Sequence, residues 1–176
     1  MKVRTAALAS IAIALIVGAC GGGTSLEAYL EGFEVLNQDV AEDVAASRLT
    51  FNLEYQDAEN EEERLALILS NFDSILVSNE DHVAGVRRLS PTQEVQQAHD
   101  AWVEGVDETL DFLATQRDAL KQITSTEEAG EFLVNLLEYP ESLRLSGTVD
   151  DACFALQAVA DGEGIDVDLL CAETLG

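Results

Sequence analysis

Apolar residues recur at intervals of three and four from residue 26 onward, the spacing that lines one face of an α-helix. The acidic residues of this first stretch fall largely on its other faces. Its apolar stripe comprises Leu26, Tyr29, Leu30, Phe33, Leu36, Val40 and Val44. From residue 49 to residue 55 the apolar positions alternate at a period of two instead, which fits either a continuing helix or a short extended segment. We favour the continuing helix.

A second helix is predicted after the acidic run at residues 56–63, continuing towards Leu89. Its stripe comprises Leu65, Leu69, Phe72, Ile75, Leu76, Val83 and Val86. Ser90 then has the character of an N-cap, with Pro91 at the first helical position and Gln93 completing a capping box. A third helix is therefore predicted to begin there and to continue to residue 123.

Two shorter helices are predicted to complete the chain. Ser125 and Glu128 form another capping box, and the helix that they open must stop near Pro140. Residues 141–147 are interpreted as a connection. The last helix is predicted over residues 149–161, with Thr148 as its cap and Gly162 after its end. Without a convincing strand pair, these elements predict an all-α fold, an antiparallel helix bundle of four to five helices.

The N-terminal residues have the character of a leader. Lys2 and Arg4 precede an apolar stretch over residues 6–17 that is too short to span a bilayer comfortably. It ends in Val17-Gly18-Ala19-Cys20, which resembles the lipobox of bacterial lipoproteins. This resemblance covers the first twenty residues and implies a signal peptide over residues 1–19. It also implies a diacylglyceryl group on Cys20 and a location in the cell envelope, anchored to a membrane. An ordinary signal peptide cut after Ala19 is the alternative.

The cysteine count agrees with a lipidated Cys20. An exported chain with three cysteines must leave one of them unpaired or modified. If Cys20 carries lipid, Cys153 and Cys171 remain as a pair, and a disulfide between them would contribute roughly 3 kcal/mol in the chain-entropy model. Two free buried thiols are the alternative. Residues 20–25 are predicted to be a glycine-rich tether, and residues 26–176 to form one domain. If the pair is bonded, the C-terminal tail folds back against the last helix.

Charge and composition narrow the classes of partner. The chain has 34 acidic residues against 9 Lys and Arg, a net charge of −25, and 47% of its residues are hydrophobic, as in globular proteins. Nucleic acid is disfavoured as a partner, because phosphate is bound by concentrated basic side chains. The acidic surface fits either a saline medium or a basic protein partner. Binding measured against ionic strength separates these two interpretations.

No catalytic, cofactor or metal motif is found. Neither His82 nor His99 has a glutamate three residues before it, so the ligand pairs of di-iron bundles are missing, and no serine lies in a nucleophile elbow. His99 shares a stripe with Trp102 and is interpreted as a packed residue, whereas His82, beside Asp81, is placed near a helix surface. Phe72, Phe112 and Phe132 are interpreted as core residues rather than as the lining of a ligand pocket.

Two acidic segments have the oxygen-rich character of calcium ligands. They are residues 57–63 and residues 161–166, and neither matches the EF-hand pattern. The first is better explained as a helix N-terminus, where acidic side chains favour the positive end of the dipole. No metal or cofactor is therefore predicted for this chain.

Two functional hypotheses follow. The first is a non-enzymatic envelope lipoprotein that binds another protein or supports an envelope assembly. The second is a lipoprotein that holds a small molecule or cation between helices for transport or sensing. The surroundings of His99 and Trp102 separate them, because an enclosed polar pocket favours ligand binding. A filled core together with an exposed apolar patch favours protein interaction.

Overall fold

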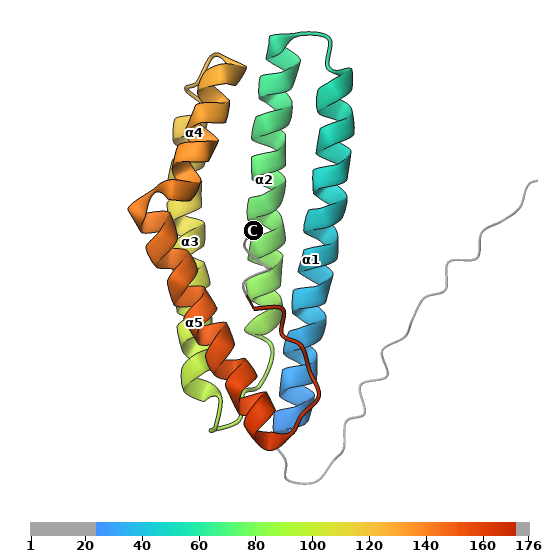
Figure 1. Cartoon of the computed structure of the whole chain (residues 1–176), viewed down its shortest axis with the longest axis vertical. Helices are drawn as coiled ribbons and strands as arrows, with labels where there is room; N and C mark the ends of the chain where they lie inside the picture. The colour runs from blue at the N-terminus through green and yellow to red at the C-terminus, as the bar shows by residue number, and fades with distance from the viewer. Residues whose placement is uncertain (1–23, 172–176) are drawn as a thin grey trace, which may run out of the picture.

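The computed structural model describes residues 24–171, and these residues form five helices and no strand (Figure 1). The predicted all-α class is confirmed. The helices are α1 (Leu26–Asp57), α2 (Glu61–Val86), α3 (Gln96–Leu120), α4 (Thr126–Glu138) and α5 (Pro140–Glu163).

Helix α2 lies between α1 and α3, α5 packs along α3, and the short helix α4 packs against α2 and α5 (Figure 1). Helix α5 runs beside the half of α3 that is nearest the start of α1. The core is divided accordingly. A first cluster joins α1, α2, α3 and α5, and a second joins α2, α3 and α4. Both clusters are formed by the apolar stripes of the helices.

Helix α1 continues through the segment whose periodicity was ambiguous, as we favoured. Its first turn is capped by the Ser25 hydroxyl, which accepts a hydrogen bond from the Ala28 N–H at 3.1 Å. The period-two alternation arises from two faces of one helix. Phe51 and Tyr55, four residues apart, pack on the second cluster, with ring centroids 5.4 Å apart. The leucines at 49 and 53, also four apart, point outward and are exposed.

The start of α3 was wrongly predicted. Ser90 and Pro91 do not open the helix, which begins at Gln96 with Val95 in the N-cap position and no side-chain cap. The reason is topological. The chain leaves α2 at Val86 and needs residues 87–95 to reverse its direction, ending in a turn in which the Val95 N–H bonds the Thr92 carbonyl at 3.2 Å. Val95 is fully buried by this turn.

The bounds of the last helix were also wrongly predicted. Residues 141–147 are not a connection, because α5 begins at Pro140, where a proline is tolerated since its missing N–H has no helical partner to lose. Leu145 and Val149, four residues apart and both 1% exposed, extend the buried stripe across the expected boundary. The helix passes Gly162 and ends at Glu163, followed by the C-cap residue Gly164, whose left-handed φ of 70° favours glycine.

Candidate functional site

The predicted candidate site, the interior around His99 and Trp102, is an aromatic–histidine cluster of Tyr29, Phe33, His82, His99 and Trp102. Helices α1, α2 and α3 each contribute to it. The Tyr29 hydroxyl and the His99 Nδ1 are joined by a hydrogen bond of 3.0 Å. The Trp102 ring makes edge contacts with Phe33 on one helix and His82 on another, at centroid distances of 5.2 Å and 5.1 Å.

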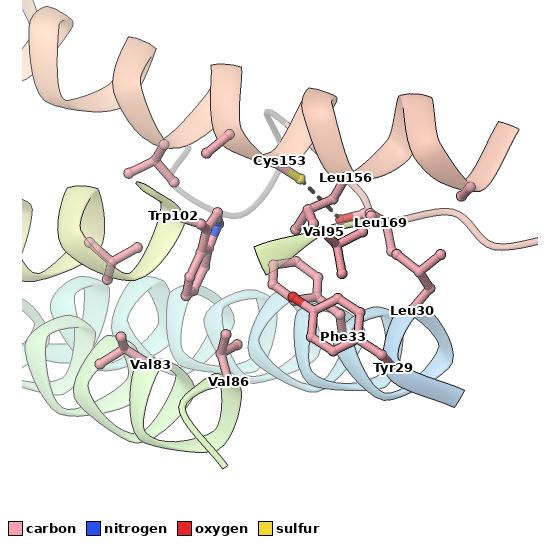
Figure 2. Packing of buried hydrophobic residues seen from close by; sticks show 14 residues of the cluster. Tyr29, Leu30, Phe33, Val83, Val86, Val95, Trp102, Cys153, Leu156 and Leu169 are labelled. Atoms are coloured by element: carbon pink, nitrogen blue, oxygen red, sulfur yellow. Dashed lines mark hydrogen bonds between the residues drawn. The ribbon is translucent and has the colours of Figure 1, made fainter. Parts of the chain in front are cut away.

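The cluster is a filled core rather than a binding pocket. Trp102 is only 2% exposed. Aliphatic side chains of α2, α5 and the C-terminal tail surround the aromatic rings of the cluster (Figure 2). His99 is buried with a hydrogen-bond partner, which is the packing role predicted for it. The interior therefore gives no support to a ligand held between helices at this point.

His82 was wrongly placed at the surface, because only 6% of it is exposed. It lies three residues after the buried Asn79 and four before the buried Val86, so the helical spacing of α2 already contained the signal. The adjacent Asp81 is exposed and does not indicate where the neighbouring side chain points. Burial lowers the pKa of His82 from 6.5 to about 4, so the imidazole is neutral at neutral pH.

The other buried groups of the cluster are also held uncharged. Burial, and secondarily the nearby carboxylate of Asp100, raises the pKa of the Tyr29 hydroxyl well above its usual value of 10.0. Burial lowers the pKa of His99, and Asp100 opposes this shift. A neutral tyrosine bonded to a neutral histidine is a structural pair, since neither group is poised to exchange a proton near neutral pH.

An acidic groove lies beside His99 on the outer side of α3. It has a volume of about 460 Å³. Its lining residues are Arg87, His99, Asp100, Val103, Glu104, Asp107, Glu108 and Asp111. Two of the carboxylates are neutralised, because Arg87 binds Asp107 and Arg144 binds Glu108 at 3.0 Å. The remaining carboxylates give the groove a negative potential that attracts cations.

These carboxylates do not form a metal centre. Within residues 24–171, no three His, Cys, Asp or Glu side chains are grouped so that they could hold a metal ion. The first oxygen-rich segment is a helix start, as expected: Asn60 caps α2 by accepting from the Glu63 N–H at 3.0 Å. Glu61 also accepts a hydrogen bond of 3.0 Å from the Thr126 N–H at the start of α4. The second segment is the C-terminal end of α5 and the turn that follows it.

The two cysteines expected to pair are joined by a disulfide, with the Cα atoms of Cys153 and Cys171 5.6 Å apart. It closes the C-terminal strap, which we define as residues 165–171. As expected, the strap folds back on α5, where Gln157 bonds both the Val167 carbonyl and the Leu169 N–H at 3.0 Å. Figure 2 shows Leu169 beneath Cys153, whose sulfur lies 3.9 Å from the Leu169 carbonyl.

The strap also reaches α1, a contact that the sequence did not predict. The Asn37 amide donates to the Leu169 carbonyl, and the Glu34 carboxylate accepts from the Asp168 N–H at 2.8 Å. Leu169 is fully buried as a result. The strap thus connects the first helix to the last one, and the disulfide holds its end in place.

The aromatic residues considered for a pocket do not meet in one place. Trp102 belongs to the first cluster, whereas Phe72 and Phe132 belong to the second. Phe112 stacks on Tyr139 at a centroid distance of 6.1 Å. Cys20, the predicted lipidation site, lies outside the described residues.

The surface carries an apolar group where α4 meets α5, which we call the α4–α5 corner. Its members are Val134, Leu137, Tyr139 and Leu143, each more than half exposed. They lie within ten residues of chain on both sides of the break between the helices. Of these four residues, Leu143 was missed in the sequence because residues 141–147 were assigned to a connection.

Comparison with protein-family models, curated proteins and solved structures gave no match for this chain. Among the helices of the described part, none is both long and apolar enough to cross a membrane.

Proposed function

We propose that the chain is an exported lipoprotein, tethered to a membrane of the cell envelope through lipid on Cys20, whose acidic helical domain binds another protein and is not an enzyme. The lipobox-like sequence Val17-Gly18-Ala19-Cys20 supports the tether. The early start of the fold also supports it. Ser25 already caps α1, so five residues, with a reach of about 12 Å, separate the anchor from the domain.

The exposed α4–α5 corner is the observation that carries the interaction role. Leu137 is 73% exposed and Leu143 is 61% exposed, although the core of the same domain is well packed. Single apolar side chains at a surface are common, but a group of them is typical of a surface that another protein covers. The filled aromatic–histidine cluster favours this role over an internal ligand site.

Charge defines the chemistry of the partner. Without Lys2 and Arg4 of the leader the net charge becomes −27, which repels other acidic surfaces. Two acidic residues neighbour the α4–α5 corner in the sequence. Glu138 is exposed, whereas Glu141 forms an ion pair with Arg144 at 2.8 Å. We infer a partner that inserts apolar side chains at the corner and surrounds them with basic ones. Association should slow as salt is added, because the steering by opposite charges is screened.

The tether is tested by fractionating cells that produce two forms of the chain. One is the wild type, and the other carries an ordinary cleavable leader in place of residues 1–20, so that the exported domain has no N-terminal cysteine to be lipidated. We expect the wild type in the membrane fraction even after a high-salt wash, and the matched form in the soluble fraction. Identical fractionation of both forms contradicts the tether.

The interaction is tested by photo-crosslinking in intact cells. A photo-reactive amino acid replaces Leu137 in one variant and Gly130, which is exposed on the same helix, in a control. A discrete adduct from position 137 and none from position 130 is the expected result. Equal labelling from both positions contradicts a specific role of the corner.

Cation binding is the alternative function, and the acidic groove beside His99 favours it. Its open carboxylates attract organic or inorganic cations, which would support a role in transport or sensing. Isothermal titration of the domain with calcium and with spermidine tests this alternative. Binding that Glu104→Gln weakens supports it, whereas heats that this substitution leaves unchanged count against it.

A further inference from the structure

The distal part of α1 carries an uncharged face that the other helices leave uncovered. We call it the α1 stripe, and it consists of Ala45, Leu49, Asn52, Leu53 and Gln56, all of them exposed. Leu49 and Leu53 are 63% and 58% exposed. The phenylalanine and tyrosine at 51 and 55 mark the side of α1 that packs inward.

The lack of charge on this face is unusual for this chain, which has 34 acidic residues. At about 100° per residue, Asp43 and Glu54 lie on the side of the helix opposite the centre of the stripe. Positions 45, 49, 52 and 56 follow the alternating four- and three-residue spacing of a coiled-coil seam. Within residues 45–57 the acidic Glu54 and Asp57 occupy outer positions that such a seam leaves to solvent, whereas Glu42, three residues before Ala45, lies on the side of the seam and ends the uncharged face.

We propose that the α1 stripe binds the α1 stripe of a second copy of this chain. The two copies are anchored in the same membrane, and their α1 helices run parallel to each other in the dimer. Two strongly acidic copies repel one another except where they meet through a face without charge. The side-chain amides of Asn52 and Gln56 support a self-pairing face, because an amide is both donor and acceptor and can bond its own counterpart across a two-fold axis.

Other occupants fit the stripe less well. A lipid surface would leave the two amides without hydrogen-bond partners, which is costly. A basic protein would be attracted to the acidic faces of the domain instead of to this uncharged one. Small Ala45 and the two leucines provide the apolar contact that a second helix needs for close approach.

The orientation of the dimer rests on the proposed function, the tether at Cys20. Copies anchored through the same end stand in the same direction, so α1 meets its counterpart in parallel and in register, with each residue opposite itself. Residues 45–56 span only about 17 Å, a short contact. Confinement to one membrane raises the effective concentration of the copies and compensates for this length.

The test uses the full-length chain in its membrane, with Leu49→Cys as the reporter. Under the proposed function the native cysteines are occupied by lipid and by the Cys153–Cys171 disulfide, so the new thiol is the reactive one. Val77→Cys is the matched control, because Val77 on α2 is also apolar and is 56% exposed. A disulfide forms only when the Cα atoms approach to within about 7 Å. We expect at least about tenfold more covalent dimer from Leu49→Cys than from the control, and equal yields overturn the proposal.

A charge exchange provides a second test of the register. Leu49 is largely exposed, so Leu49→Asp is expected to fold normally, with an unchanged circular dichroism spectrum. With Asn52→Cys as the reporter, two Leu49→Asp copies should lose the crosslink, because aspartates then face each other. One Leu49→Asp copy and one Leu49→Lys copy should regain it. Equal crosslinking of the two combinations overturns the in-register pairing.

Failure of the tether is distinguishable from failure of the dimer. If the leader is removed and Cys20 carries no lipid, the wild-type chain leaves the membrane fraction. Self-association is then decided by sedimentation equilibrium of the full chain: a dimer that Leu49→Asp dissociates supports the α1 stripe, and a monomer overturns it. If the chain stays in the membrane and Leu49→Cys does not crosslink, only the dimer is wrong.

Discussion

Replacing His82 with phenylalanine removes a titratable group from the core and keeps an aromatic ring against Trp102. His82 is 6% exposed, and its Nε2 has no hydrogen-bond partner among the described residues. Burial lowers its pKa from 6.5 to about 4. The folded protein therefore binds a proton at this site less readily than the unfolded chain does.

The lowered pKa of His82 sets the sign and size of the change in the free energy of unfolding with pH. The contribution of neutral His82 to stability is fully present above about pH 6.5 and is lost as the pH falls through the interval down to about 4. Between about pH 8 and pH 5 the linkage relation gives a loss of about 2 kcal/mol in the free energy of unfolding from this one group. In the His82→Phe variant this loss should disappear.

Urea unfolding, followed by the fluorescence of the single tryptophan, measures the difference. Carboxylates titrate in both proteins. Their contribution therefore cancels when the free energy of unfolding of the variant is subtracted from that of the wild type at each pH. His99→Gln serves as the control and should retain the dependence that His82 causes. If the free energy of unfolding of wild type and His82→Phe falls equally between the two pH values, the assignment of a buried neutral His82 is refuted.

Two further predictions concern the strap and the helix contacts. Replacing both Cys153 and Cys171 with serine should lower the free energy of unfolding by about 3 kcal/mol, because the closed loop no longer restricts the unfolded chain; an unchanged urea midpoint contradicts this. Gly85→Ala should destabilise the fold by about 1–3 kcal/mol, because the added Cβ would lie 2.8 Å from Leu36 Cδ2. Gly130→Ala should stabilise the fold by up to about 1 kcal/mol, because no other atom lies within 4 Å of its added Cβ and alanine favours the helix. Thermal melts that shift in the same direction for both alanine variants would show that this packing argument is wrong.

The sequence predicted helix existence better than helix ends. Apolar spacing located all five helices of residues 24–171, because each buries a stripe that the spacing reveals. The start of α3 could not be predicted from its capping pattern, because the reversal of the chain after α2 uses those residues as a connection. Pro140 was interpreted as a stop, although a proline at the first position of a helix fits without loss.

Only those features of the candidate site that follow from neighbouring residues or from the number of cysteines could be predicted from the sequence. The cysteine count identified Cys153 and Cys171 as a possible pair, and the structure joins them. His99 was correctly interpreted as packed. The bond from Asn37 to the Leu169 carbonyl joins residues 132 positions apart, so no local pattern indicated it. The burial of His82 was present in the helical spacing but was obscured by its charged neighbour.

Mass spectrometry of the mature chain purified from membranes tests the tethered lipoprotein most directly. We expect the first residue to be Cys20 and its sulfur to carry a diacylglyceryl group. A mature chain that begins at Cys20 with an unmodified thiol, or one that keeps the leader, would contradict the account.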